Sequence, residues 1–208
     1  MNSRILIKIG GRAFDGEEGF RELAQGIKET PGTEVIIVHG GGAEISQALK
    51  AAGRETVFVD GMRVTQAADV TIVESVLSGL INARIAGWLS KNGVACRRMS
   101  GKTQGLLIAE PLLARGGKSM GFVGRIVKVN AAGALDALAK NEVPVVSPIS
   151  GDTQGQSYNV NADSAAAALA AAAHCSDLVF ITDVPGVMVG NKTLDRLTVA
   201  EAKDLIAD

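Results

Sequence analysis

Hydrophobic residues along this chain form short apolar runs that alternate with longer stretches of helical periodicity. The helical stretches lie at residues 16–30, 43–52, 131–140 and 165–173. The apolar runs, rich in Val and Ile, predict β-strands at residues 4–9, 34–39, 56–59, 94–99, 143–146 and 178–182. Strands that alternate with helices are typical of parallel βαβ units. The pattern therefore predicts an α/β fold with a mostly parallel sheet, in which residues 34–39 and 178–182 form central strands.

Three segments depart from this alternation. Residues 65–92 carry apolar side chains at three- and four-residue spacing, which predicts one long helix with a wide apolar stripe. We expect part of this stripe to face a partner subunit. Residues 106–129 contain glycine pairs and alternating runs without helical period, so we expect an inserted region of antiparallel β-hairpins there. The polar residues 150–158 predict a loop.

Composition narrows the functional class. The 208 residues include 21 Lys and Arg against 22 Asp and Glu, a formal net charge of −1 that argues against a basic nucleic-acid-binding protein. The longest charge-free stretch around the alanine tract, residues 164–176, is shorter than the roughly 20 apolar residues of a membrane span. Cys96 and Cys175 have no metal-binding or redox spacing. We therefore expect a cytoplasmic protein with no membrane contact, no nucleic-acid partner and no resident metal.

Glycines follow two of the predicted strands directly. Gly10 and Gly11 come after residues 4–9, and Gly40, Gly41 and Gly42 come after residues 34–39. Ligands bind beyond the carboxyl ends of the strands in an open parallel sheet, and the N–H groups at a helix start favour phosphate or carboxylate. Neither loop has the spacing of a Walker motif or a dinucleotide fingerprint. Lys8, in an otherwise apolar strand, is either at a sheet margin or directed at an anion, and the nearby glycines favour the anion.

Several other polar residues are candidates for the same site. Arg63 could bind a carboxylate with its planar guanidinium, although taken alone a surface salt bridge is the simpler interpretation. Asn159, Asn161 and Asp163 precede the alanine-rich helix, which needs only one of them as an N-cap. His39, at a strand end, is more typical of a hydrogen-bonded structural histidine than of a catalytic base.

Together these motifs resemble the amino acid kinase family, and within it the acetylglutamate kinases. The segments that carry the resemblance are collinear and span nearly the whole chain: 8–11 (KIGG), 38–42 (VHGGG), 61–65 (GMRVT), 121–124 (GFVG), 143–146 (VPVV), 158–163 (YNVNAD) and 182–187 (TDVPGV). The resemblance implies a doubly wound α/β sandwich. It also implies transfer of the ATP γ-phosphoryl group, with Mg²⁺ bound to the ATP, to the side-chain carboxylate of N-acetyl-L-glutamate in arginine biosynthesis.

The resemblance also implies roles for individual residues. Lys8 would stabilise charge on the transferred phosphoryl group, and Asp163 would orient Lys8. The substrate-binding residues would be Gly41, Gly42, Arg63 and Asn159, with Arg63 on the α-carboxylate of the acceptor. The phosphate- and nucleotide-binding residues would be Gly10, Gly11, Asp183 and Gly186.

Near the C-terminus the resemblance sets a further expectation. In the family, a glycine-rich stretch with a second catalytic lysine follows the segment that corresponds to residues 198–207. We therefore expect residues 1–208 to form a single domain, with an acceptor-binding lobe at about 1–175 and the start of an incomplete nucleotide-binding lobe at about 176–208. Since the chain begins at its first strand, we expect a homodimer formed through the helix at 65–92 rather than a hexamer.

Two alternatives remain open. One is a kinase for a related acylated amino acid, such as an aminoadipate derivative. The other is a shortened binding module without catalytic activity, which would recognise an acidic amino-acid derivative and would not bind ATP.

Overall fold

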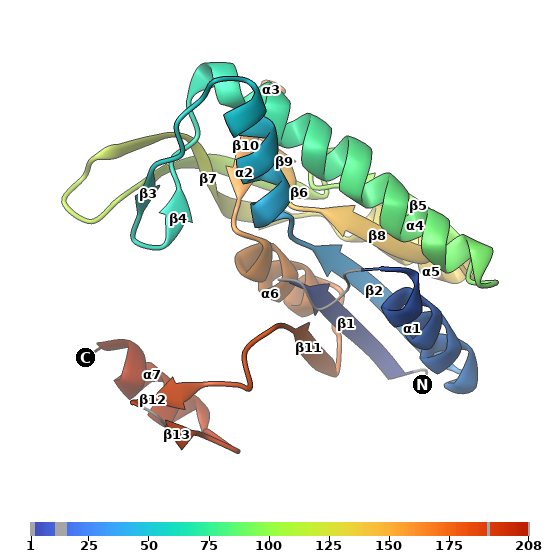
Figure 1. Cartoon of the computed structure of the whole chain (residues 1–208). Helices are drawn as coiled ribbons and strands as arrows, with labels where there is room; N and C mark the ends of the chain where they lie inside the picture. Colours follow the sequence, from blue (N-terminus) through green and yellow to red (C-terminus); the bar gives the residue numbers. More distant parts are fainter. Residues whose placement is uncertain (1–2, 11–15, 191, 208) are drawn as a thin grey trace.

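A computed structural model describes residues 3–10, 16–190 and 192–207. Its centre is a five-stranded parallel sheet with strand order β11-β1-β2-β8-β5 (Figure 1). The strands are β1 (Ser3–Ile9), β2 (Thr33–His39), β5 (Cys96–Ser100), β8 (Val143–Ser147) and β11 (Asp177–Ile181). β5 forms one edge of the sheet, β8 lies between it and β2, and β11 lies on the other side, beside β1. The predicted doubly wound α/β architecture is confirmed.

Helices cover both faces of this sheet. One face carries α1 (Glu17–Glu29), α2 (Gly42–Ala51) and the long helix, and the other carries α5 (Ala132–Ala139) and α6 (Ala162–Ala172). Alternate strand residues enter the two cores: Ile7 and Ile37 pack in the first, and Leu6 and Ile36 in the second. This alternation decides which helical layer each strand-borne functional side chain faces.

The long helix predicted at 65–92 consists of three consecutive segments, α3 (Ala67–Glu74), a π-helical segment η1 (Ser75–Ile81) and α4 (Asn82–Lys91). Its central π-helical turn was not predicted, because the apolar spacing is nearly the same for α- and π-helices. This helix is long and apolar enough to cross a membrane by length and composition. Here its apolar stripe, which includes Val73, Leu77, Ile81 and Leu89, belongs to the first core.

A small closed barrel follows the carboxyl ends of β5 and β8. It contains β6 (Leu107–Leu113), β7 (Ser119–Val129), β9 (Ile149–Gly151) and β10 (Ser157–Val160). The antiparallel pairing of β6 and β7 confirms the predicted hairpin. The prediction of a loop at 150–158 is wrong at both ends of this range, because its first residues belong to β9 and its last residues belong to β10. Its serines are buried and hydrogen-bonded, as Ser157 is to Glu74 at 2.7 Å, so their polarity did not indicate exposure.

The C-terminal residues extend away from the sheet (Figure 1). They form β12 (Met188–Val189), β13 (Lys192–Thr193) and α7 (Val199–Ala207), while the short hairpin of β3 (Phe58–Val59) and β4 (Met62–Arg63) and the 3₁₀ turn η2 (Thr103–Gly105) complete the elements. The prediction that residues 178–182 form a central strand is wrong. Within the described residues β11 is an edge strand, and Val179 and Phe180 are 42% and 47% exposed. An apolar run shows strand propensity but does not specify how many neighbours a strand has.

Candidate active site

An ion pair between Lys8 and Asp163 lies where β1 meets the start of α6. The Lys8 Nζ is 2.7 Å from the Asp163 Oδ1, with the lysine side chain 13% exposed and the aspartate side chain 54% exposed. Asn161 is the N-cap of α6, since its Oδ1 accepts a hydrogen bond from the Ser164 N–H at 2.9 Å. Asp163 is therefore not needed as a cap and is held in the first helical turn, where the helix dipole favours a carboxylate.

Gly10 continues β1 directly beside this pair. Its N–H donates to the carbonyl of Ile181, and the Gly40 N–H donates to the carbonyl of Ile9, both at 2.9 Å. A Cβ atom on Gly10 would lie 2.2 Å from the Lys8 Nζ. Only glycine leaves room here for the lysine to reach across the strand end. The predicted phosphate-binding residue Gly11 lies outside the described residues.

The second glycine loop leads from β2 into α2. Gly41 precedes the helix, and a Cβ on it would lie 2.2 Å from the Ile81 Cδ1, so the loop packs directly on the long helix. The first N–H groups of a helix have no partners within it, and here they open toward the carboxyl ends of the strands. The Cβ of Ala162 lies 3.9 Å from the position of a Cβ on Gly40, which places this loop beside the start of α6. The two glycine loops and the Lys8–Asp163 pair therefore form one site.

Arg63 is buried against this second loop, with 8% of its surface exposed. Its guanidinium donates to the carbonyl of Gly42 at 2.9 Å, to the Ser46 Oγ at 2.8 Å and to the Thr56 Oγ1 at 3.0 Å. The ring of Phe58 lies 4.8 Å from it. Burial lowers the pKa of Arg63 from its usual value. A surface salt bridge, the simpler interpretation from sequence, is excluded, and the structure instead joins Arg63 to the start of α2.

Asn159 approaches the same region from the barrel strand β10. Its Nδ2 donates to the Thr65 Oγ1 at 3.0 Å, and Thr65 is fully buried two residues after Arg63. Thr65 belongs to the GMRVT segment, but its position in the sequence did not indicate this contact with Asn159. Arg63 and Asn159 are thus linked through one short segment of chain, as a common binding role requires.

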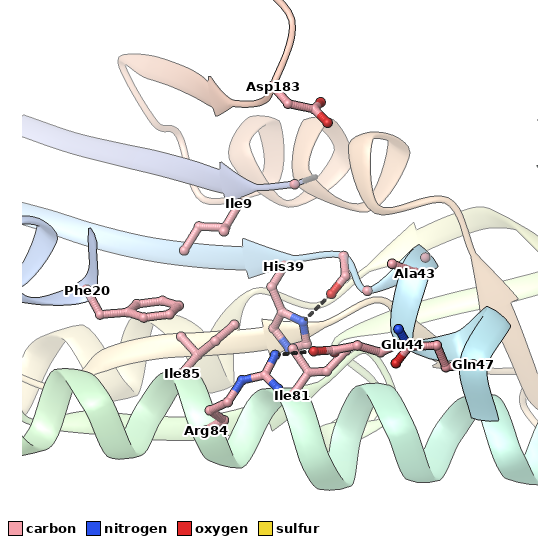
Figure 2. A pocket seen from close by; sticks show the side chains of 14 residues that line it. Ile9, Phe20, His39, Ala43, Glu44, Gln47, Ile81, Arg84, Ile85 and Asp183 are labelled. Atoms are coloured by element: carbon pink, nitrogen blue, oxygen red, sulfur yellow. Dashed lines mark hydrogen bonds and ion pairs between the residues drawn. The ribbon is translucent and has the colours of Figure 1, made fainter. Parts of the chain in front are cut away.

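A cavity of about 590 Å³ opens between the carboxyl ends of β1 and β2 on the side of α1 and α4 (Figure 2). Its lining includes Gly10, the three glycines of the second loop and Asp183, together with the apolar side chains Ile9, Phe20, Ile81 and Ile85. Arg84 and Glu44 lie in the wall of the cavity and form an ion pair with a nitrogen–oxygen distance of 2.6 Å (Figure 2). Sequence reasoning missed this pair, because a helical arginine and glutamate 40 residues apart carry no motif.

The cavity contains only part of the predicted site. Lys8, Asp163, Arg63 and Asn159 are not among the residues that line it. For Lys8 the reason is the alternation of β1, which directs its side chain toward the α6 layer. Gly186 is not in the lining either, and a Cβ on it would lie 3.1 Å from the Thr193 Cγ2 in the extended C-terminal segment. Within the described residues there is also no group of three or more metal-ligating side chains.

His39 ends β2 immediately before the second loop and is 1% exposed. Its Nδ1 lies 3.0 Å from the carbonyl oxygen of Gly40, and its Nε2 lies 3.2 Å from the Asn82 Nδ2. Burial lowers the pKa of His39 from 6.5 to about 4, and the positive charge of Arg84 contributes to this. The interpretation as a hydrogen-bonded structural histidine is confirmed as far as its bonds are concerned.

This histidine predicts how stability depends on pH. Between pH 6.5 and about 4 the unfolded chain binds a proton at His39 and the folded chain does not, so acid stabilises the unfolded state. The free energy of unfolding is expected to fall by about 3 kcal/mol as pH decreases across this window and to gain nothing from His39 above it. Urea unfolding at intervals between pH 4 and 8 measures the change. An H39N variant should lose this part of the slope, and an unchanged slope would contradict the prediction.

Comparison with known proteins shows the family of this chain. The sequence profile of the Amino acid kinase family matches residues 3–208. The acetylglutamate kinase of Geobacillus stearothermophilus is 39% identical over 209 residues, which are 100% of this chain and 80% of that protein. The acetylglutamate kinase of Agrobacterium fabrum is 39% identical over 224 residues, covering 100% of this chain and 74% of the relative.

Solved structures share the fold of this chain. The smu.665 protein of Streptococcus mutans has a TM-score of 0.82 at 26% identity and covers 100% of this chain and 83% of its own. An N-acetylglutamate synthase from Neisseria gonorrhoeae, at 24% identity, shares the fold with a TM-score of 0.81 over 99% of this chain and 48% of its own. The profile matches all but the first two residues, and the similarity to these two acetylglutamate kinases extends over the whole chain. This protein belongs to the amino acid kinase family.

Proposed function

We propose that this protein transfers the γ-phosphoryl group of ATP to the side-chain carboxylate of N-acetyl-L-glutamate, a step of arginine biosynthesis. The observation that carries the proposal is the Lys8–Asp163 pair of 2.7 Å set between two glycine-lined strand ends. In the reaction the bond between the γ-phosphorus and the bridging oxygen of ATP breaks, and a bond from that phosphorus to a carboxylate oxygen forms. ADP leaves, and the product is an acyl phosphate.

Lys8 and the glycines would act on the group in transfer. Phosphoryl transfer requires positioned reactants and neutralised charge, and a lysine ammonium supplies that charge without forming a covalent bond. Asp163 would hold the Lys8 Nζ at the strand end while the Gly11 amide approaches phosphate oxygens. Gly10, whose N–H already donates to the Ile181 carbonyl, would contribute by leaving room for the phosphate and for Lys8. This assignment agrees with the steric need for glycine at position 10.

The acceptor would bind at the second loop. Gly41 and Gly42 offer amides at the start of α2, and Arg63, already bonded to the Gly42 carbonyl, offers its guanidinium to the α-carboxylate. Asn159, held by Thr65, would contact the acetylamino group. The Arg63 guanidinium and the amides at the start of α2 could each bind one acidic group of the acceptor. This suits a small dicarboxylate better than a neutral substrate.

The nucleotide would enter from the side of β11, where Asp183 and Gly186 lie in the segment after that strand. Mg²⁺ would arrive with ATP, where it screens the phosphate charges. We assign residues 1–175 to the acceptor lobe and residues 176–208 to the nucleotide lobe. The exposed edge of β11 and the extended C-terminal segment are consistent with this division.

A hydroxylamine trap tests the function. The protein with Mg²⁺-ATP and N-acetylglutamate should give a trappable hydroxamate, with the Geobacillus stearothermophilus enzyme as positive control. An N-acetylated aminoadipate in place of the acceptor tests the neighbouring specificity. Binding of N-acetylglutamate without binding of ATP, measured by calorimetry, would contradict the kinase and support a binding module.

We further propose that the protein is a homodimer formed through the long helix. Its exposed face has small residues at four-residue spacing at Thr71, Ser75 and Gly79, and a further one, Gly87, eight residues on. These would let a second copy approach closely, and Leu80 beside them is 57% exposed. A G79R variant is expected to shift the protein from dimer to monomer in light scattering coupled to gel filtration. Gly26, on the exposed face of α1, gives the matched control G26R, which should stay dimeric. A monomeric wild type would exclude the proposal.

A further inference from the structure

A buried chain of polar side chains runs from the second glycine loop into the first helical layer. It consists of His39 and Asn82, which are both 1% exposed, and of Arg98, which is exposed and ends the chain at the surface. Figure 2 shows the His39 ring beside the loop, with its bond to the Gly40 carbonyl drawn. Buried polar groups of this kind are costly unless each has a partner. The partners here define a single arrangement of the chain.

The tautomer of His39 follows from its neighbours. The carbonyl oxygen of Gly40 can only accept a hydrogen bond, so the Nδ1 that lies 3.0 Å away must carry the proton. The neutral ring then has an unprotonated Nε2, which accepts from the Asn82 Nδ2 at 3.2 Å. The low pKa of His39 agrees with a ring that stays neutral.

The orientation of Asn82 is fixed in the same way. Its Oδ1 accepts from the Arg98 Nε at 3.2 Å, and its Nδ2 lies 2.8 Å from the carbonyl of Val145 and 3.2 Å from the carbonyl of Met99. A flipped amide would place an oxygen against that carbonyl and against the lone pair of His39. Arg98 in turn donates to the carbonyls of Ser78 and Gly79 in the π-helical segment. The donor that reaches His39 is therefore anchored in both a β-strand and the long helix.

This chain sets the direction of one amide in the site. In a trans peptide the N–H of a residue points opposite to the preceding carbonyl, so a fixed Gly40 carbonyl fixes the Gly41 N–H away from His39. Within the described residues that N–H has no hydrogen-bond acceptor. The Gly41 carbonyl is held as well, by the Ile45 N–H at 3.0 Å. Both peptide planes around Gly41 are thus oriented before any ligand binds.

We infer that His39 and Asn82 are positioning residues for the kinase reaction, which hold the Gly41 N–H toward the anionic substrate. The inference rests on the proposed function. Asn82 is not among the residues that line the cavity, whereas His39 lines it beside the Gly40 carbonyl. Their effect passes through the Gly40 peptide, so it should appear in kcat more than in stability.

Two substitutions distinguish the contributions of the two ring nitrogens of His39. In H39N the amide nitrogen takes the position of Nδ1 and can still donate to Gly40, whereas in H39Q the side-chain amide takes the position of Nε2 and reaches only Asn82. We expect H39N to keep kcat within about tenfold of wild type and H39Q to lose about a hundredfold, the typical cost of one oriented donor. A kcat for H39Q equal to or above that of H39N, at matched unfolding midpoints, would overturn the inference.

A second measurement does not depend on activity or on the folding of the His39 variants. In ¹⁵N-histidine NMR of the H174N protein, which leaves His39 as the remaining histidine, the proton should be on Nδ1 at every pH between 5 and 8. A proton on Nε2 would overturn the inference. If the wild type gives no hydroxamate while Nδ1 carries the proton, the proposed function fails and the loop geometry stands, so the two failures are distinguishable.

Discussion

Replacing Lys8 with alanine is expected to reduce kcat for hydroxamate formation by about a thousandfold. The Lys8 side chain is 13% exposed, and its ammonium group lies 2.7 Å from the Asp163 Oδ1, between the two glycine loops. Removal of one preorganised charged contact to a developing oxyanion typically costs 10²–10³ in kcat, about 3–4 kcal/mol of transition-state stabilisation. Steady-state kinetics with saturating ATP and N-acetylglutamate measure the loss.

Lys50 provides the matched control for this substitution. It lies exposed in the last turn of α2, so K50A removes the same side chain outside the proposed site and should keep wild-type kcat. Calorimetry with N-acetylglutamate adds a second comparison, because K8A should still bind the acceptor through Arg63. A K8A variant with wild-type kcat would exclude the assigned role of Lys8, whereas loss of both kcat and folding would show a structural role.

The periodicity of the sequence was sufficient for most of the fold because the two helical layers and the sheet bury different patterns. Residues 34–39 are apolar on both faces and become β2, which has Ile36 in one core and Ile37 in the other. The alternation of β1 likewise determines that Lys8 faces the layer of α6. These features depend on local sequence and on one rule of strand geometry.

What could not be predicted depends on contacts between distant segments. Ser157 of β10 looks like a loop residue until Glu74 and Lys102 are placed beside it. Taken alone, Arg63 in the sequence indicated an exposed side chain. It is instead buried against a loop, because α2 and the β3–β4 hairpin meet. His39 shows the same limit, since its role depends on Asn82, which is 43 residues away in the chain.

Replacing Gly10 with alanine is expected to abolish most activity while leaving the fold intact. The added Cβ would lie 2.2 Å from the Nζ and 3.1 Å from the Cε of Lys8, and Lys8 must then move away from Asp163. The end of a flexible side chain can move at little cost to stability, so the loss should fall on kcat. A displacement of a reacting group by about 1 Å typically costs about a hundredfold in rate.

Gly26 in α1 makes this prediction specific. It has no atom within 4 Å of an added Cβ, and in a helix interior alanine is more favourable than glycine by about 0.5–1 kcal/mol. G26A should therefore raise the unfolding midpoint slightly and keep wild-type kcat, while G10A should keep the midpoint and lose kcat. If G10A were as active as G26A, the ammonium of Lys8 would not need its position beside Asp163, and the assignment of this ion pair to phosphoryl transfer would have to be abandoned.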